Sequence, residues 1–242
     1  MTLSRDARHL ALPQVGTDGQ RRIREASALL IGVGGIGCPA VAYLASSGVG
    51  RLVVCDFDTV DATNLGRQVL YTDKHIGEYK ADVAAERLTK INAEVTVTAV
   101  NERLSGKALA KAVEDVDVVL DASDNFATRF EVNDACVAAS LRLVSGSAIR
   151  LEGQLAVFGP DYGSSPCYRC VYDEHDESVG DCAGSGVLSP VPGVIGTMMA
   201  VETLKYIAGM DARPLLRLYD ATAVEFRRLE ISKRSSCPTC GA

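Results

Sequence analysis

Four glycines stand close together at residues 32–37, where the chain changes from one type of secondary structure to another. The apolar residues 28–31 predict a short buried strand, and residues 39–46 predict a helix. Glycine allows the tight turn between such elements and lets a ligand approach the backbone, while the first helix amides face an anion. The pattern therefore favours an α/β chain whose loop, with Gly34 and Gly35 in its middle, binds the phosphates of a nucleotide. A turn without a ligand is the simpler alternative.

Residues 26–50 carry no charged side chain, and a stretch of this length can span a bilayer. The glycines and the proline within it are typical of a strand, loop and helix of a soluble protein instead. No signal peptide is expected, because Arg5, Asp6 and Arg8 interrupt the apolar residues at the N-terminus. The formal net charge of −6 argues against nonspecific binding of nucleic acid. We therefore expect a cytoplasmic protein that binds neither membranes nor nucleic acids.

Predicted strands and helices alternate over the N-terminal part of the chain. The expected strands are residues 28–31, 51–56, 95–100, 116–120 and 143–149. The expected helices are residues 39–46, 80–91, 107–113 and 127–139. This alternation is typical of a Rossmann-like, mostly parallel sheet with helices on both faces.

The pattern changes after about residue 150. A strand at 153–158 follows its predecessor after a short connection, so the two should be antiparallel. Then come a long loop, a helix and a terminal hairpin, at residues 159–189, 193–208, 215–219 and 225–231. We expect a single α/β domain over residues 1–242, with a nucleotide-binding half (1–150) and a mixed or antiparallel half (151–242).

Asp56 ends the second predicted strand, 19 residues after the last glycine of the loop. An acid at this distance binds a ribose hydroxyl in dinucleotide-binding proteins, so Asp56 by itself favours a nucleotide such as NAD. The residues that follow do not fit NAD: they are Asp58, Asn64, Arg67 and Lys80. A triphosphate carries more charge than a dinucleotide's pyrophosphate. Arg67 would bind it through a planar, bidentate guanidinium and Lys80 through a compact ammonium group. The alternative is two solvated surface charges.

Asp124 and Asn125 follow another predicted strand, at the end where open α/β sheets place their ligands. A carboxylate there suits Mg²⁺, which is held by one or two carboxylates together with phosphate oxygens. The alternative role for Asp124 is the N-cap of the helix that follows, and both roles are compatible.

Four cysteines form two C-x-x-C pairs, Cys167 with Cys170 and Cys237 with Cys240. Two such pairs make up the ligand set of a closed tetrahedral zinc site, and a redox pair is the weaker alternative. Because no coordination position stays open, we expect the zinc to be structural and to tether the C-terminal tail to the loop after residue 158.

The remaining cysteines divide into two kinds. Cys55 and Cys136 lie in apolar strand or helix contexts and are expected to be buried and inert. Cys38 stands at the start of a helix, a place that lowers the pKa of a thiol. Cys182 lies in the polar, glycine-rich segment 179–186, where an accessible thiol can react or be incidental.

Taken together, these motifs resemble those of the bacterial E1-like adenylyltransferases of the ThiF/MoeB/HesA family, which activate sulfur-carrier proteins. The resemblance runs along nearly the whole chain. It is carried by residues 5–8, 32–37, 56–58, 64–68, 77–80, 121–125, 167–170, 179–186, 193–196 and 237–240. Within the family, residues 167–170 and 217–220 and the segment around Cys182 look more like ThiF than MoeB.

The resemblance implies an enzyme that uses MgATP to adenylate the C-terminal Gly-Gly carboxylate of a small ubiquitin-like carrier. By family position, Asp56 and Asn64 hold the ribose, and Arg67 and Lys80 hold the phosphates. Asp124 holds the magnesium.

The family also implies partners. Arg8 matches an arginine that reaches the ATP site of the neighbouring subunit, which implies a homodimer with composite sites. Cys182 matches the cysteine that attacks the activated carrier or engages a sulfur donor in ThiF-type proteins. Residues 5–9 read Arg-Asp-Ala-Arg-His where the family has Arg-Tyr-Ser-Arg-Gln. No appended rhodanese domain is expected, so sulfur would come from a separate desulfurase or rhodanese-type donor.

Three alternatives remain open. A MoeB-type enzyme would serve molybdopterin synthesis instead of the thiazole branch of thiamine synthesis. An NAD-dependent oxidoreductase would leave Arg67, Lys80 and Asp124 without a use. A noncatalytic adenine-nucleotide sensor would bind ATP and transfer nothing.

Overall fold

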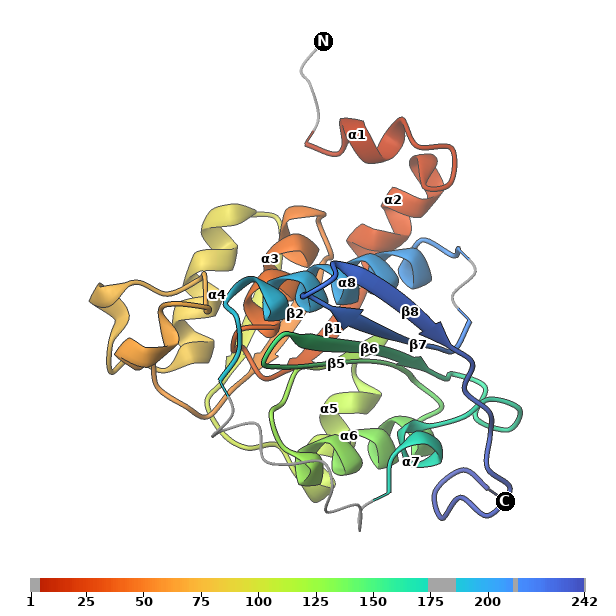
Figure 1. Ribbon diagram of the computed structural model, residues 1–242. Coiled ribbons are helices and arrows are strands. Elements are labelled where there is room, and N and C mark those ends of the chain that lie inside the picture. Colours follow the sequence, from red (N-terminus) through yellow and green to blue (C-terminus); the bar gives the residue numbers. More distant parts are fainter. Residues whose placement is uncertain (1–4, 174–185, 211–212, 242) are drawn as a thin grey trace.

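Eight strands form one sheet in the computed structural model, which describes residues 5–173, 186–210 and 213–241 (Figure 1). The order across the sheet is β3-β2-β1-β4-β5-β6-β7-β8. The strands are β1 (Ser27–Ile31), β2 (Arg51–Cys55), β3 (Thr96–Val100), β4 (Val118–Asp121), β5 (Arg142–Ile149), β6 (Glu152–Phe158), β7 (Leu215–Asp220) and β8 (Glu225–Leu229). Strands β1 to β5 pair in parallel, and β5 to β8 pair antiparallel. The expected change from a parallel to an antiparallel half is confirmed.

Helices cover both faces of the sheet, as the alternating pattern predicts. The longer helices are α2 (Gly16–Glu25), α3 (Gly37–Ser46), α4 (Lys80–Ile91), α5 (Gly106–Glu114), α6 (Phe126–Ala138) and α8 (Pro190–Ile207). Shorter helices are α1 (Ala7–Leu10), η1 (Ala62–Asn64), η2 (Asp73–His75) and α7 (Tyr168–Val171). Helices α2, α3, α4 and α8 share one apolar core, whereas α5, α6 and α7 share the core on the other face. Figure 1 shows these two layers above and below the sheet.

The strand order places a crevice beside β1. The chain runs outward from β1 to β3 and then returns to the other side of β1 as β4. The loops after β1 and β4 therefore diverge, and open α/β sheets bind ligands at such a point.

Some element boundaries differ from the expectation. Helix α8 begins at Pro190, not at residue 193, because a proline in the first turn gives up an amide that has no helical partner anyway. A short helix, α7, occupies part of the segment expected to be a loop. Strand β8 ends at Leu229, two residues early, and it pairs only with β7 at the edge of the sheet.

Residues 26–50 fold into β1, the glycine loop and α3, as expected for a strand, loop and helix. Among the helices of the described residues, none is both long and apolar enough to cross a membrane.

Candidate active site

The glycine loop links β1 to α3, and two of its glycines are required by the backbone. Gly32 has a φ of +87°, a conformation that favours glycine, and its amide donates to Cys55 O at 2.8 Å. A Cβ on Gly37 would lie 2.0 Å from Gly32 O. A Cβ on Gly34 would have only the Gln68 amide nitrogen near it, at 3.6 Å. Gly32 and Gly37 therefore fix the turn, and Gly34 leaves space for a ligand.

A cavity of about 670 Å³ opens at the ends of β1, β2 and β4, beside this loop. All nine residues expected to bind the nucleotide and its magnesium line it: Gly34, Gly35, Asp56, Asp58, Asn64, Arg67, Lys80, Asp124 and Asn125. Five separate segments of the sequence thus meet around one space, which is large enough for a ligand of nucleotide size.

Asp56 follows β2 directly and is held by two backbone amides. Its Oδ2 accepts from Val33 N at 2.8 Å, and its Oδ1 accepts from Asp58 N at 3.0 Å. Burial raises the pKa of Asp56, and the positive charge of Lys80 acts against that rise. A carboxylate oxygen has two lone pairs, so Asp56 can still accept a hydroxyl from a ligand.

Lys80 is the first residue of α4 and is one of the residues that line the cavity. Its side chain is only 8% exposed, and Nζ lies 2.8 Å from Asp58 Oδ2. The alternative of a solvated surface charge is therefore wrong for Lys80. The hydroxyl of Tyr71 donates to Val33 O at 2.7 Å and lies 3.3 Å from Lys80 O, so it ties α4 to the glycine loop.

Arg67 and Asn64 lie on the segment around η1. Arg67 is half-buried, and its Nη1 donates to Thr63 O at 3.0 Å. Asn64 Oδ1 accepts from Asp61 N at 3.1 Å, as part of the capping box of η1. These bonds hold both side chains at the rim of the cavity.

Asp124 and Asn125 are exposed at the entrance to α6. The N-cap of α6 is Asn125, whose Oδ1 accepts from Thr128 N at 2.9 Å. The capping role considered for Asp124 is therefore wrong, since the adjacent residue performs it. Asp124 accepts a 3.4 Å bond from Asn125 Nδ2 and presents its carboxylate to the cavity. An exposed carboxylate oxygen beside a phosphate site fits Mg²⁺.

The structure adds residues to which the sequence assigned no role. Gln68 lines the cavity, and its buried Oε1 has no hydrogen-bond partner among the described residues, so it can accept from a bound ligand. Gln68 directly follows Arg67 within residues 64–68, and this position beside an expected phosphate ligand indicates a role at the site. Arg129 also lines the cavity and donates to Ser123 O at 2.7 Å. Asp121 is fully buried at the end of β4, and burial raises its pKa.

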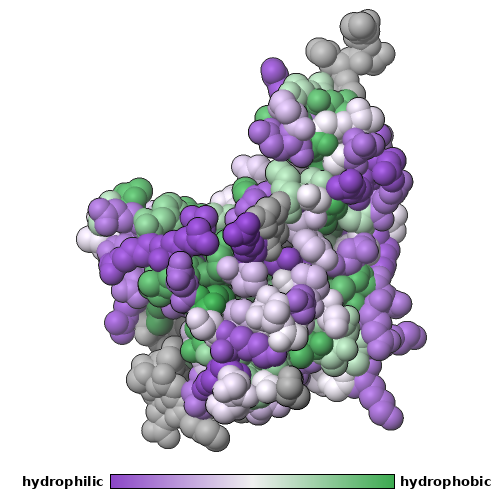
Figure 2. Space-filling model, turned by 90° about the vertical axis from the view of Figure 1, so that its right-hand side faces the viewer, coloured by the Kyte–Doolittle hydropathy of each residue, from purple (hydrophilic) through white to green (hydrophobic). Residues whose placement is uncertain are grey.

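One of the expected catalytic residues, Arg8, does not join this cavity. Arg8 is exposed on α1, which lies at the projecting end of the molecule at the top of Figures 1 and 2. It does not line the cavity of its own chain. Cys182 lies outside the described residues.

The four cysteines of the C-x-x-C pairs converge as expected, with their sulfur atoms within 4.8 Å of one another. Cys167 Sγ and Cys237 Sγ are 3.6 Å apart, and Cys170 Sγ and Cys240 Sγ are 3.4 Å apart. Four sulfurs about 2.3 Å from a tetrahedral zinc would be about 3.8 Å from one another. The cluster therefore fits a structural zinc ion, and the amide of Arg234 donates to Cys170 Sγ at 3.4 Å.

Three other cysteines are buried. Burial raises the pKa of Cys38 to about 12 and that of Cys55 to about 11, and it also raises the pKa of Cys136. The lowered pKa considered for Cys38 is wrong, because loss of solvent outweighs its place at the start of a helix. Cys55 and Cys136 are buried thiols, as expected.

Comparison with known proteins agrees with the motifs. The sequence profile of the ThiF family matches residues 7–239. The sulfur carrier protein ThiS adenylyltransferase of Escherichia coli K12 is 42% identical over 98% of this chain and 94% of its own length. The molybdopterin-synthase adenylyltransferase of the same organism is 41% identical over 97% and 94%. The crystal structure of E. coli MccB with ATP shares the fold, with a TM-score of 0.84 and 21% identity over 98% of this chain and 74% of that one. The chain belongs to the ThiF family.

Proposed function

We propose that this protein is an ATP-dependent adenylyltransferase that acts on the C-terminal Gly-Gly carboxylate of a small ubiquitin-like sulfur carrier protein. The observation that carries the proposal is the cavity, where a buried lysine, a fixed aspartate and an open glycine loop meet. Two relatives that are 42% and 43% identical along nearly the whole chain are named adenylyltransferases of sulfur carrier proteins.

The reaction needs no general base, because the attacking carboxylate is already an anion. One of its oxygens bonds to the α-phosphorus of ATP, and the bond from that phosphorus to the oxygen bridging to the β-phosphate breaks. Pyrophosphate leaves with the electron pair, and the carrier becomes an acyl-adenylate. Catalysis then consists of positioning and charge neutralisation.

Each of the seven side chains expected to bind the nucleotide or its magnesium has a role in this scheme. Asp56 and Asn64 hold the ribose, while Arg67 and Lys80 bind the phosphates. Asp124 and Asp58 offer carboxylate oxygens to Mg²⁺, which neutralises phosphate charge when bound. Asn125, as the N-cap of α6, holds the turn on which Asp124 stands.

Arg8 acts in the active site of a second copy of the chain. Arg8 does not line the cavity of its own chain, which supports this assignment, since in a homodimer the arginine would meet the phosphates bound by the partner subunit. We further propose that Cys182 receives the activated carrier or the sulfur, which a separate desulfurase or rhodanese-type donor supplies in the cytoplasm.

The carrier is a ThiS-like protein of thiamine synthesis in our preferred assignment, on the ThiF-like motifs noted above. The relatives that serve ThiS and molybdopterin synthase are 42% and 41% identical, so a MoaD-like carrier is the second candidate.

Carrier-dependent exchange of labelled pyrophosphate into ATP tests the proposal. We expect exchange with a ThiS-like carrier, less with a MoaD-like carrier, and none with a carrier that lacks the terminal glycine. Exchange that is absent with every cognate carrier, in a protein that binds ATP, would favour a nucleotide sensor. Binding of NAD with hydride transfer would favour an oxidoreductase.

A further inference from the structure

The two zinc-binding C-x-x-C segments meet helix α6 at a single carboxylate, that of Asp134. Its Oδ1 accepts from Thr239 Oγ1 at 2.9 Å. The guanidinium of Arg169 donates to both of its oxygens, from Nε to Oδ1 at 2.9 Å and from Nη2 to Oδ2 at 2.9 Å. Arg169 lies inside the segment 167–170, and Thr239 lies inside the segment 237–240. One side chain of α6 therefore bonds to both halves of the zinc site.

Neighbouring contacts strengthen the bond to the first segment. The Arg169 side chain is only 16% exposed, and its guanidinium lies 4.4 Å from the centre of the Phe130 ring. The buried Asn133 accepts from Tyr168 N at 2.7 Å. A bidentate ion pair that is partly shielded from water is stronger than an ordinary surface pair. The segment thus packs on α6 through bonds that do not involve a metal ion.

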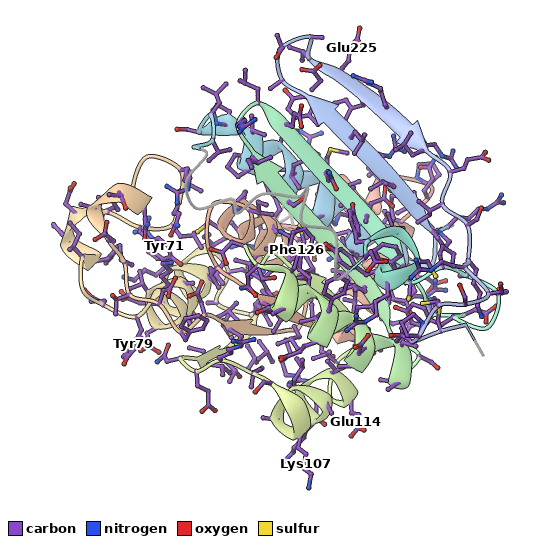
Figure 3. The ribbon with its side chains drawn as sticks, turned by 60° about the horizontal axis from the view of Figure 1, so that its bottom comes forward. Tyr71, Tyr79, Lys107, Glu114, Phe126 and Glu225 are labelled. Atoms are coloured by element: carbon purple, nitrogen blue, oxygen red, sulfur yellow. The ribbon has the colours of Figure 1, made fainter. Side chains whose placement is uncertain are left out.

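The other end of α6 forms part of the nucleotide cavity. Asn125 caps the helix, and Arg129 donates to Ser123 O, so the turn that carries Asp124 is fixed by α6 itself. Figure 3 labels Phe126 at this end. Asp134 stands nine residues after Asn125, about 14 Å along the axis of one continuous helix.

We propose that Asp134 is a positioning residue that holds both C-x-x-C segments on α6 and thereby couples the zinc site to the nucleotide cavity. It assembles the four thiols before the metal arrives, so zinc binding has less chain to order. The coupling is reciprocal: bound nucleotide strengthens zinc binding, and bound zinc strengthens nucleotide binding by the same factor. Loss of the Asp134 contacts weakens this coupling and, with it, nucleotide binding. This part rests on the proposed function, because it takes the cavity to be an ATP site.

The first test measures zinc release from the folded, zinc-loaded protein into an excess of a coloured chelator. Asp134→Asn keeps the size of the side chain but removes the ion pair, and it should release zinc at least about tenfold faster than the wild type. Thr239→Val removes one bond and should give a smaller increase. Glu114→Gln is the matched control, since Glu114 lies on α5 and points away from the body of the molecule (Figure 3). Equal release rates for the wild type and both variants at the zinc site would overturn the proposal.

The second test adds a nonhydrolysable ATP analogue with Mg²⁺. We expect the analogue to raise the zinc affinity of the wild type about fivefold, measured by competition with the chelator at equilibrium, and to bind Asp134→Asn about fivefold more weakly than the wild type. An unchanged zinc affinity, or equal affinities of the two proteins for the analogue, would overturn the coupling. If the analogue binds neither protein, the nucleotide site of the proposed function fails, while the first test still decides the role of Asp134.

Discussion

Replacement of Lys80 by methionine removes a cation from the cavity and keeps the length of the side chain. The Lys80 side chain is 8% exposed, and its partner Asp58 is 54% exposed. Asp58 can therefore recover water when the pair is broken, so we expect a loss of about 1 kcal/mol of stability. In a chain of this size that lowers the melting temperature by about 2–4 °C.

The effect on the reaction should be much larger. A unit charge about 4 Å from a phosphate charge contributes about 4 kcal/mol at the effective dielectric near a protein surface. Loss of one preorganised donor from a reacting centre lowers kcat about 100- to 1,000-fold. We therefore expect Lys80→Met to lower carrier-dependent ATP–pyrophosphate exchange by this factor.

The exposed Lys74 provides the matched control for this variant. Lys74→Met changes the net charge equally and lies outside the residues that line the cavity. It should leave exchange within about twofold of the wild type, as surface charges have small effects. A folded Lys80→Met protein with less than tenfold loss of exchange would refute the assignment of Lys80 to the phosphates.

Further predictions concern the magnesium, the dimer and the thiols. Asp124→Ala should abolish exchange without lowering the melting temperature measured by calorimetry, because Asp124 does not cap α6; a large loss of stability would contradict this. Arg8→Ala should be inactive alone, yet mixing it with inactive Lys80→Met should restore exchange through hybrid dimers that contain one intact site; hybrids without exchange would exclude a role across subunits. Cys182→Ser should leave exchange intact and block sulfur transfer; loss of both activities in the folded variant would contradict the separation of adenylation from sulfur transfer. Cys38, with a pKa of about 12, is about one part in ten thousand thiolate at pH 8, so mass spectrometry should find it unalkylated in the folded protein.

Patterns that repeat along the chain were predictable from sequence. The buried strands are apolar runs, and their order follows from alternation with helices, which placed Asp56 and Asp124 at the same edge of the sheet. Helix α2 was not predicted, because Ile23 is its only large buried apolar residue, and a single residue cannot show the helical repeat of apolar positions. Hydrogen bonds hold α2 in place instead, including one from Gln20 Nε2 to Ser47 O at 3.0 Å.

Other features depend on contacts between distant segments. Asp124 and Asn125 are both good capping residues, and only the path of the backbone decides which one caps α6. The burial of Lys80 follows from the packing of α4 against the glycine loop through Tyr71. Asp134 is an ordinary helix residue until the two C-x-x-C segments fold against it.

Transfer of the nucleotide itself tests the central claim most directly. The enzyme is incubated with a Gly-Gly-ended carrier, Mg²⁺ and ATP labelled on either the α- or the γ-phosphate, with the pyrophosphate removed. We expect label from the α-phosphate, and none from the γ-phosphate, to appear on the carrier, and deletion of its terminal glycine should prevent this. Label from the γ-phosphate on the carrier, or none from either position with any cognate carrier despite ATP binding, would contradict the proposed adenylation.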